Sequence, residues 1–384
     1  MATGNESSSS RVVHHIQWSE ALPWWLLFRA AGAAFSPSVI LLAACGALAT
    51  WAGWSVADSL GLAGGAVAND VVIAVPAPKP PAPGLSASAH AVPALRAAAD
   101  LLPATVGNVL RLVALPFSPS STLREAGGAL ARIGWFVLVW SIFGTAIVRH
   151  VALSLVGEET PGLLGGIRYG SQNWLSAFNS VAFVLVGILA LSIPGALLGL
   201  LMRTDIGLAL AGAVWPLVLA GAVVLAILAI GVVAAWPLMV ATVGIERGDS
   251  FQAISTACSY FYQRPLHVAF YAVVALLVAI PAFAAAGVLA DATGTLALWA
   301  ASFGMGHDRT AAVLEGVRTC TTAGGCSEPW GVKALAFWTR GLEWLLGSFG
   351  WGYFWSIATA AYLLLRQDVD GTELDEVVLD DSAA

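Results

Sequence analysis

Residues 169–245 read YGSQNWLSAFNSVAFVLVGILALSIPGALLGLLMRTDIGLALAGAVWPLVLAGAVVLAILAIGVVAAWPLMVATVGI, and Arg203 and Asp205 are the only charged residues among them. No soluble core holds so long an uncharged apolar run. A helix of about 20 apolar residues, by contrast, crosses a hydrocarbon layer of ~30 Å. The stretch is long enough for several crossings. It predicts an all-α integral membrane protein with several transmembrane helices.

The composition of the whole chain agrees with a membrane location. The chain is 58% hydrophobic and 10% charged, whereas a soluble domain is roughly a quarter charged. The 16 Trp and 40 Gly also fit, since Trp favours the bilayer interface and Gly favours close contact between helices. The net charge of −6 argues against nucleic acid as a partner, which needs a basic face. We expect membrane lipids among the partners and no nucleic acid.

The apolar segments predict about six transmembrane helices with additional interfacial amphipathic helices. The Pro-rich segment 75–83 is expected to be an extended spacer, because proline disrupts helices and sheets. The predicted order of parts is a polar tail and interfacial helix (1–34), the first span (35–60), an extramembrane Pro-rich linker with an amphipathic segment (61–130), a four-span helical core with a candidate internal repeat (131–290), an extramembrane loop with a Cys pair and an interfacial helix (291–345), the last span (346–366) and an acidic tail (367–384).

The apolar run from Ile206 to Ile245 admits two interpretations. As one helix its 40 residues would extend about 60 Å, twice what one crossing needs. A hairpin of two spans would need a turn near the middle, where Gly221 is the only turn-forming residue. The pairs Trp215-Pro216 and Trp236-Pro237 are separated by a helical length of about 31 Å, which matches two interfacial belts. We therefore predict one helix that extends beyond both interfaces.

Two regions of the predicted core contain the same three kinds of segment in the same order. In each, a short acidic segment precedes an amphipathic segment and then a span. At a fixed offset Val156, Gly157, Glu159 and Ile167 match Val243, Gly244, Glu246 and Ile254. Such a repeat is common in transporters. Four matches over a short window also arise by chance, and the question stays open at this point.

The second of these regions carries a resemblance to known proteins. It contains Pro237-Leu238-Met239, then Glu246, then Asp249-Ser250-Phe251-Gln252-Ala253-Ile254-Ser255, then Ser259-Tyr260 and Arg264-Pro265. In this order a span leads into a short acidic turn, an amphipathic helix and a new span. The outline resembles the membrane domain attached to some glycerophosphodiester phosphodiesterases, and also uncharacterised bacterial multi-pass membrane proteins.

The segment 352–373 resembles the ends of such bacterial proteins too, so that the resemblance covers residues 150–290 and 345–376. It implies a multi-pass protein of the bacterial cytoplasmic (inner) membrane. The phosphodiesterase domain, with its metal-binding carboxylates and histidines, has no counterpart in the sequence, and its activity does not carry over.

Cys320 and Cys326 flank a short Thr- and Gly-containing loop that suits a small disulfide. The bond requires that the loop face an oxidising compartment; the alternative is two free thiols in the cytosol. Six spans place both termini on one side of the membrane. Because the Pro-rich and Cys-containing loops suit the outside, we expect both termini in the cytosol.

A few ionisable residues lie near the ends of the predicted spans, where lipid headgroups or other polar groups are within reach. We expect Arg149 to extend to lipid phosphates and Arg203 to pair with Asp205 across a tight turn. The candidates for headgroup or polar contacts are Arg132, Arg149, His150, Arg203, Asp205, Arg264 and His267. No catalytic, metal or phosphate-binding motif occurs, and we expect no cofactor.

These features predict a non-catalytic membrane subunit or scaffold that binds partner proteins, or further copies of itself, and lipids. The absence of a carboxylate in mid-membrane argues against coupled transport. The alternative is a transporter or permease for a lipid-like or small apolar substrate, which the candidate repeat and the prolines of the spans favour. A membrane enzyme would need Arg149, His150, Arg264 and His267 around one pocket, and we expect no enzyme.

Overall fold

The computed structural model describes residues 22–62, 104–117, 122–322, 327 and 329–372. Within these residues the chain is helical and contains no strand. The helices are α2 (Trp25–Ala33), α3 (Pro37–Ser59), α5 (Ala104–Ala114), the 3₁₀ turn η1 (Leu115–Phe117), α6 (Leu123–Val156), α7 (Gly162–Leu201), α8 (Asp205–Glu246), α9 (Ser250–Gln263), α10 (Pro265–Met305), α11 (His307–Thr322), α12 (Trp330–Gly347) and α13 (Phe349–Asp370). The prediction of an all-α fold is confirmed.

Five of these helices are long and apolar enough to cross a membrane: α3, α6, α7, α8 and α10. The expected number of about six was therefore too high by this measure. The predicted last span corresponds to α13, which is a helix but is interrupted by Gly, Ser, Thr, Tyr and Trp residues. These residue types suit a helix that packs against protein, and almost every residue from Phe349 to Leu365 is buried.

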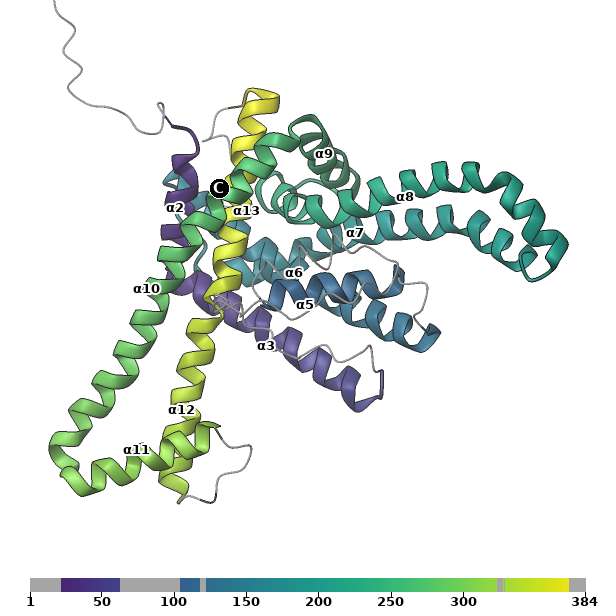
Figure 1. Ribbon diagram of the computed structural model, residues 1–384. Helices are drawn as coiled ribbons and strands as arrows, with labels where there is room; N and C mark the ends of the chain where they lie inside the picture. Colours follow the sequence, from purple (N-terminus) through teal and green to yellow (C-terminus); the bar gives the residue numbers. More distant parts are fainter. Residues whose placement is uncertain (1–21, 63–103, 118–121, 323–326, 328, 373–384) are drawn as a thin grey trace, which may run out of the picture.

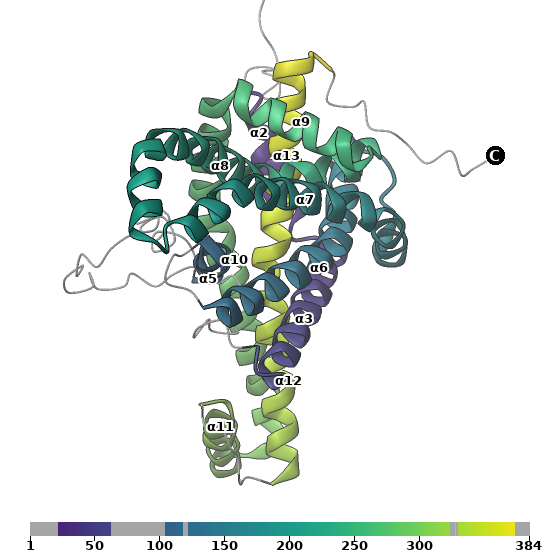
Figure 2. The same ribbon diagram turned by 90° about the vertical axis from the view of Figure 1, so that its right-hand side faces the viewer.

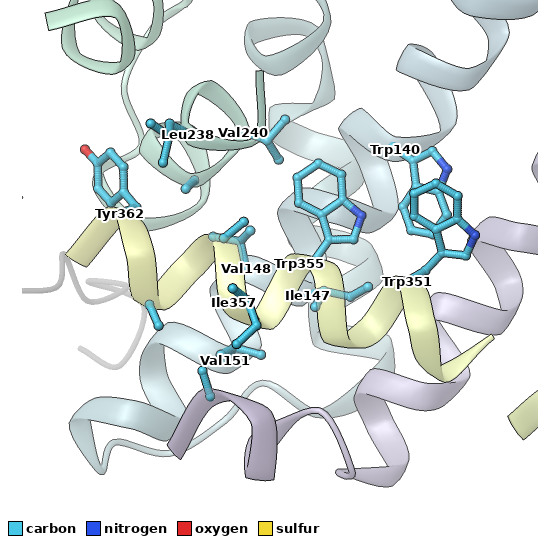
Figure 3. Packing of buried hydrophobic residues seen from close by; sticks show 14 of the residues in the cluster. Trp140, Ile147, Val148, Val151, Leu238, Val240, Trp351, Trp355, Ile357 and Tyr362 are labelled. Carbon is cyan, nitrogen blue, oxygen red and sulfur yellow. The ribbon is translucent and has the colours of Figure 1, made fainter. Parts of the chain in front are cut away.

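Helix α13 lies at the centre of the fold, with α2, α3, α6, α8 and α10 packed around it (Figures 1 and 2). Figure 3 shows its Trp and Tyr side chains packed among aliphatic side chains of neighbouring helices. The rings of Trp351 and Trp140 stack with their centres 4.5 Å apart, and Trp355 meets Trp236 edge to face at 5.3 Å. Gly144 lets the Trp355 ring of α13 lie against α6, because a Cβ at position 144 would lie 2.8 Å from that ring.

Helix α6 is the most enclosed of the five apolar helices. In its most apolar segment of 18 residues, 83% of the residues are buried. Its ends are well defined. Thr122 and Glu125 form a reciprocal capping box at the N-terminus, and Gly157 adopts φ 91° at the C-terminus, a conformation that suits glycine. Together α6 and α13 form the inner core of the protein.

The run from Ile206 to Ile245 is one helix, α8, as predicted. Thr204 caps it by accepting a hydrogen bond from the Gly207 amide, and Pro216 and Pro237 both lie inside it. With α7 it forms a long hairpin that extends away from the core (Figure 1). Outside the core, residues 183–230 of this hairpin expose aliphatic side chains along most of their length. We call this part the α7–α8 arm.

The predicted loop at 291–330 is largely helical instead. Helix α10 continues to Met305, and α11 follows after Gly306, which adopts φ 75°. The Thr and Gly residues from position 291 onward predicted a loop. However, the Thr293 hydroxyl donates to the Leu289 carbonyl within the helix, and the surrounding Ala and Leu residues favour helix.

The second half of α10 together with α11 and α12 forms another extension, which points in a different direction from the α7–α8 arm (Figures 1 and 2). We call it the α10–α12 arm. The predicted interfacial helix at 333–345 is found within α12. Its position at a membrane interface stays a prediction.

The predicted interfacial helix near the N-terminus is α2, and it ends before Ser36, so it is separate from the first span. Leu27 and Ala30 are fully buried, while Trp25 and Phe28 face outward. Arg29 donates to the Leu155 carbonyl at 2.7 Å. Helix α2 is therefore bound to the protein core along one side, and only its other side is free to meet lipid.

Candidate functional site

Arg132 is enclosed by protein. Its side chain is 2% exposed and forms an ion pair with Asp58 of α3. The indole of Trp54 donates to the Arg132 carbonyl at 3.2 Å. Of the two contacts predicted for Arg132, a lipid headgroup or another polar group, the structure shows the second, because the guanidinium pairs with Asp58 and joins α3 to α6.

Arg149 is also buried, at 2% exposure, and so does not extend to lipid phosphates as expected. Its guanidinium carbon lies 5.1 Å from the centre of the Tyr169 ring, and that of Arg247 lies 5.7 Å from the same ring. The Tyr169 hydroxyl contacts the carbonyl oxygens of Val243 and Gly244 at 3.1 and 3.2 Å. This cluster ties α6 and α7 to the end of α8.

His150 lies beside this cluster and is likewise buried. Its Nε2 atom is 3.3 Å from the hydroxyl of Ser36, so it joins α6 to the residue that precedes α3. His150 therefore lies in the protein interior, as Arg132 and Arg149 do.

Arg203 and Asp205 lie in the exposed turn at the tip of the α7–α8 arm. They do not form the expected ion pair within the structure described here. Instead Asp205 occupies the first turn of α8, where a carboxylate favours the positive end of the helix dipole. Both residues are exposed, unlike Arg132, Arg149 and His150.

Arg264 and His267 come together on one carboxylate. Asp368, near the end of α13, lies 3.3 Å from Nε of Arg264 and 3.9 Å from Nε2 of His267. All three side chains are partly exposed. The sequence indicated the two basic residues but not their shared acidic partner.

A second carboxylate lies close to this site. Glu246, at the end of α8, accepts hydrogen bonds from Tyr362 at 2.5 Å and from Gln252 at 3.2 Å, and pairs with Arg366 at 3.3 Å. The hydroxyl of Tyr260 donates to Asp370. We call the set of polar side chains at this end of the fold the polar junction: Glu246, Tyr260, Arg264, His267, Tyr362, Arg366, Asp368 and Asp370.

The polar junction is nearly balanced in charge. The acidic residues are Glu246, Asp368 and Asp370, against Arg264 and Arg366 and a histidine that charges only when protonated. Burial raises the pKa of Tyr260 above its ordinary value, and its hydrogen bond to Asp370 and the charges of Asp370 and Glu246 raise it further. The phenol therefore stays protonated and serves as a donor.

A pocket of about 570 Å³ borders the polar junction. It lies between the start of α2, the first turns of α10 and the end of α13. Its lining is mostly apolar and aromatic: Pro23, Trp24, Leu266, His267, Phe270, Tyr271, Leu364, Gln367 and Asp368. Asp368 is the one acidic residue of this lining, which also contains the aromatic rings of Trp24, Phe270 and Tyr271. A mostly apolar pocket with a few polar groups suits the binding of a small ligand.

The structure keeps two groups of the predicted residues apart. Arg149 and His150 belong to the cluster around Tyr169, while His267 lines the pocket and Arg264 adjoins it. Arg149 and His150 are not among the residues that line this pocket. Within the described part of the chain, no group of three or more His, Cys, Asp or Glu side chains is placed to hold a metal ion.

Several residues of the site were missed from the sequence, above all Tyr362, Asp368 and Asp370. The segment 366–370 was read as the end of a span followed by a tail, although α13 continues through it to Asp370. Arg366 and Asp370 are four residues apart with opposite charges, which is a signal that the helix continues to Asp370. Which partners they meet depends on helices far away in the sequence.

The predicted disulfide involves Cys320, which is buried at the end of α11. Cys326 lies outside the described residues, so the pairing stays a prediction. Most of the Pro-rich linker, the N-terminal tail and the acidic tail from residue 373 onward also lie outside them.

No protein-family model, curated protein or solved structure matches this chain. The resemblance to the membrane domains of glycerophosphodiester phosphodiesterases stays a prediction.

Proposed function

We propose that this protein is a non-catalytic membrane subunit or scaffold that binds partner proteins, or further copies of itself, and lipids. The observation that carries the proposal is the contrast between a closely packed aromatic core and two long arms with exposed apolar surfaces. A location in the bacterial cytoplasmic membrane, with both termini in the cytosol, is part of the same proposal.

The core supports a structural role. Helix α13 is buried among five other helices, and its Trp residues interlock with those of α6 and α8. Charged residues near the core, such as Arg132 and Arg149, are used to join helices. The two arms extend from this core in different directions (Figures 1 and 2).

The two arms supply the binding surfaces. Exposed apolar side chains on the α7–α8 arm include Val186, Leu189, Ile193, Leu197, Leu208, Leu217, Val223 and Ile230. Those on the α10–α12 arm include Leu296, Trp299, Phe303, Trp330, Phe337 and Trp338. Apolar surfaces of this extent need cover by lipid or by protein. The aromatic residues of the α10–α12 arm are of the type enriched at protein interfaces.

The arrangement gives less support to the alternative, a transporter. That function would require α7, α8 and α10, which carry the prolines of the apolar core, to surround a common cavity. Helix α7 packs against α6, α8 and α9, whereas α10 packs against α2, α9, α12 and α13. The pocket beside the polar junction is lined by α2, α10 and α13, and does not lie between α7 and α8.

The proposal is tested by native mass spectrometry of the full chain extracted gently from its own membrane. We expect a stoichiometric complex with a partner protein or with further copies. The variant Trp338→Ser, which removes an exposed ring from α12, should lower the complexed fraction. The matched variant Trp215→Ser, on the α7–α8 arm, separates a role of one arm from a general effect of losing an exposed Trp. A lone chain in every preparation, combined with substrate flux in proteoliposomes, would overturn the proposal.

A further inference from the structure

The pocket beside the polar junction has the chemistry of a site for an amphiphile. Three aromatic rings form part of its wall. The Trp24 and Phe270 rings meet edge to face with their centres 6.4 Å apart, and the Phe270 and Tyr271 rings are 5.8 Å apart. Ring faces attract ammonium groups, and more strongly where water is partly excluded.

Opposite charges meet at the edge of this pocket. Asp368 lines it, and Arg264 and His267 approach the same carboxylate oxygen at 3.3 and 3.9 Å. Because Arg264 and His267 are nearly half exposed and Asp368 about a third, an ion pair here is worth at most about 1 kcal/mol. A ligand that carries both charges can therefore insert its cation toward Asp368 and its anion toward Arg264.

An apolar stripe on α10 begins at the pocket and leads away from it. Its members are spaced by four and three residues and share one face of the helix: Leu266, Phe270, Val273, Leu277 and Ile280. All five are exposed, from 46% at Phe270 to 82% at Leu266. From residue 266 to residue 280 the helix rises about 21 Å, enough for acyl chains in one leaflet of a ~30 Å layer.

We propose that this pocket and the α10 stripe bind a zwitterionic phospholipid whose headgroup carries an ammonium group. The ammonium group lies between Asp368 and the rings of Trp24, Phe270 and Tyr271. The phosphate lies against Arg264 and His267, and the acyl chains lie along the stripe. This site rests on the lipid-binding part of the proposed function and names the class of lipid. It is tested separately from the scaffold role, because a protein with any function in the membrane can hold such a lipid.

The test is native mass spectrometry of the full-length chain, delipidated in mild detergent. Phosphatidylethanolamine, phosphatidylcholine and phosphatidylglycerol with identical acyl chains are supplied one at a time. We expect one phosphatidylethanolamine or phosphatidylcholine to be retained about tenfold more strongly than phosphatidylglycerol, the order of one charge-assisted contact. Soluble glycerophosphoethanolamine, which has the headgroup but no chains, should bind far more weakly, because the stripe then contributes nothing.

Two variants probe the two parts of the headgroup site. Asp368→Asn removes the acidic group but keeps its shape, and Phe270→Ala removes a partly exposed ring without opening the core. Each should lower retention of the zwitterionic lipid about tenfold. Asp291→Asn makes the same chemical change at an exposed position on the same helix, and should leave retention unchanged.

Three results would overturn the proposal. Phosphatidylglycerol could bind as strongly as the zwitterionic lipids, which would assign the site to the basic residues alone. Binding could survive in both Asp368→Asn and Phe270→Ala, which would place the lipid elsewhere. Glycerophosphoethanolamine could bind as well as the lipid, which would point to a soluble ligand. None of these results bears on whether the protein forms a complex, so the scaffold proposal stands or falls separately.

Discussion

The hydroxyl of Tyr362, in the middle of the polar junction, donates a hydrogen bond of 2.5 Å to the carboxylate of Glu246. The two residues lie 116 positions apart in the chain. The bond joins the end of α8, which carries the α7–α8 arm, to the central helix α13. The junction thus sets where one arm leaves the core.

Loss of this hydrogen bond should destabilise the protein. Tyr362→Phe leaves a largely buried carboxylate without its phenol donor, and a hydrogen bond to a charged group contributes about 1.5–3 kcal/mol. We expect the free energy of unfolding in detergent to fall by about that amount. Tyr262→Phe serves as a control, since Tyr262 is exposed and its hydroxyl donates to a neutral carbonyl, that of Ile227. Equal effects in the two variants would contradict the special role of Glu246.

A methyl group at Gly144 should disturb the aromatic core. The added Cβ would lie 2.8 Å from the ring of Trp355, so the helices must move apart, which costs about 1–3 kcal/mol. Gly187 on α7 has nothing within 4 Å of its would-be Cβ. Gly187→Ala should therefore be neutral or stabilise the helix by up to about 1 kcal/mol. Thermal unfolding of both variants measures the difference, and destabilisation by Gly187→Ala alone would reverse the expectation.

Replacement of Arg149 should matter more than replacement of Arg203. Arg149→Ala removes a buried side chain packed on Tyr169, with an expected loss of about 2–4 kcal/mol from the lost packing and cation–π contact. Arg203→Ala, at the exposed tip of the α7–α8 arm, should change stability by no more than about 0.5 kcal/mol. Chemical denaturation in the same detergent compares them. A large effect at Arg203 with none at Arg149 would show that the tip and not the cluster needs its arginine.

The contribution of Tyr260 should depend on pH with a defined sign. Its pKa is raised in the folded state, so the folded protein favours the protonated phenol. The stability that Tyr260 contributes over Phe is then fully present below the unfolded pKa of about 10, and is lost as the pH rises through the folded pKa. The difference in unfolding free energy between wild type and Tyr260→Phe should be constant from about pH 7 to 9 and shrink above about pH 10. A difference that grows with pH in this range would contradict the donor role.

The local properties of the chain could be read from the sequence. The uncharged run of residues 169–245 indicated membrane helices, because hydrocarbon tolerates few charges. The single helix α8 followed from the distance between two Trp-Pro pairs, and the helices α2 and α12 followed from their Trp-rich apolar composition. These inferences depend on residues close together in sequence, where helix geometry relates spacing directly to position.

Partners of the polar residues could not be read in this way. The sequence showed that Arg132, Arg149 and His150 lie near span ends, and it predicted lipid phosphate as the partner of Arg149 and a headgroup or another polar group for the other two. Their actual partners come from other helices: Asp58, Tyr169 and Ser36. The loop predicted after Leu289 failed for a different reason, because Thr and Gly are tolerated in a helix whose hydroxyls bond to its own backbone.

The chain's hydropathy and helix spacing thus account for its all-α fold and its membrane character. The packing of α2, α8, α9, α10 and α13 accounts for the polar junction, for the pocket beside it and for the depth at which α13 is buried. The physical reason is that hydropathy adds up along a segment, whereas a hydrogen bond or an ion pair needs two groups within about 3–4 Å. Groups such as Glu246 and Tyr362 come that close only when helices distant in sequence pack together.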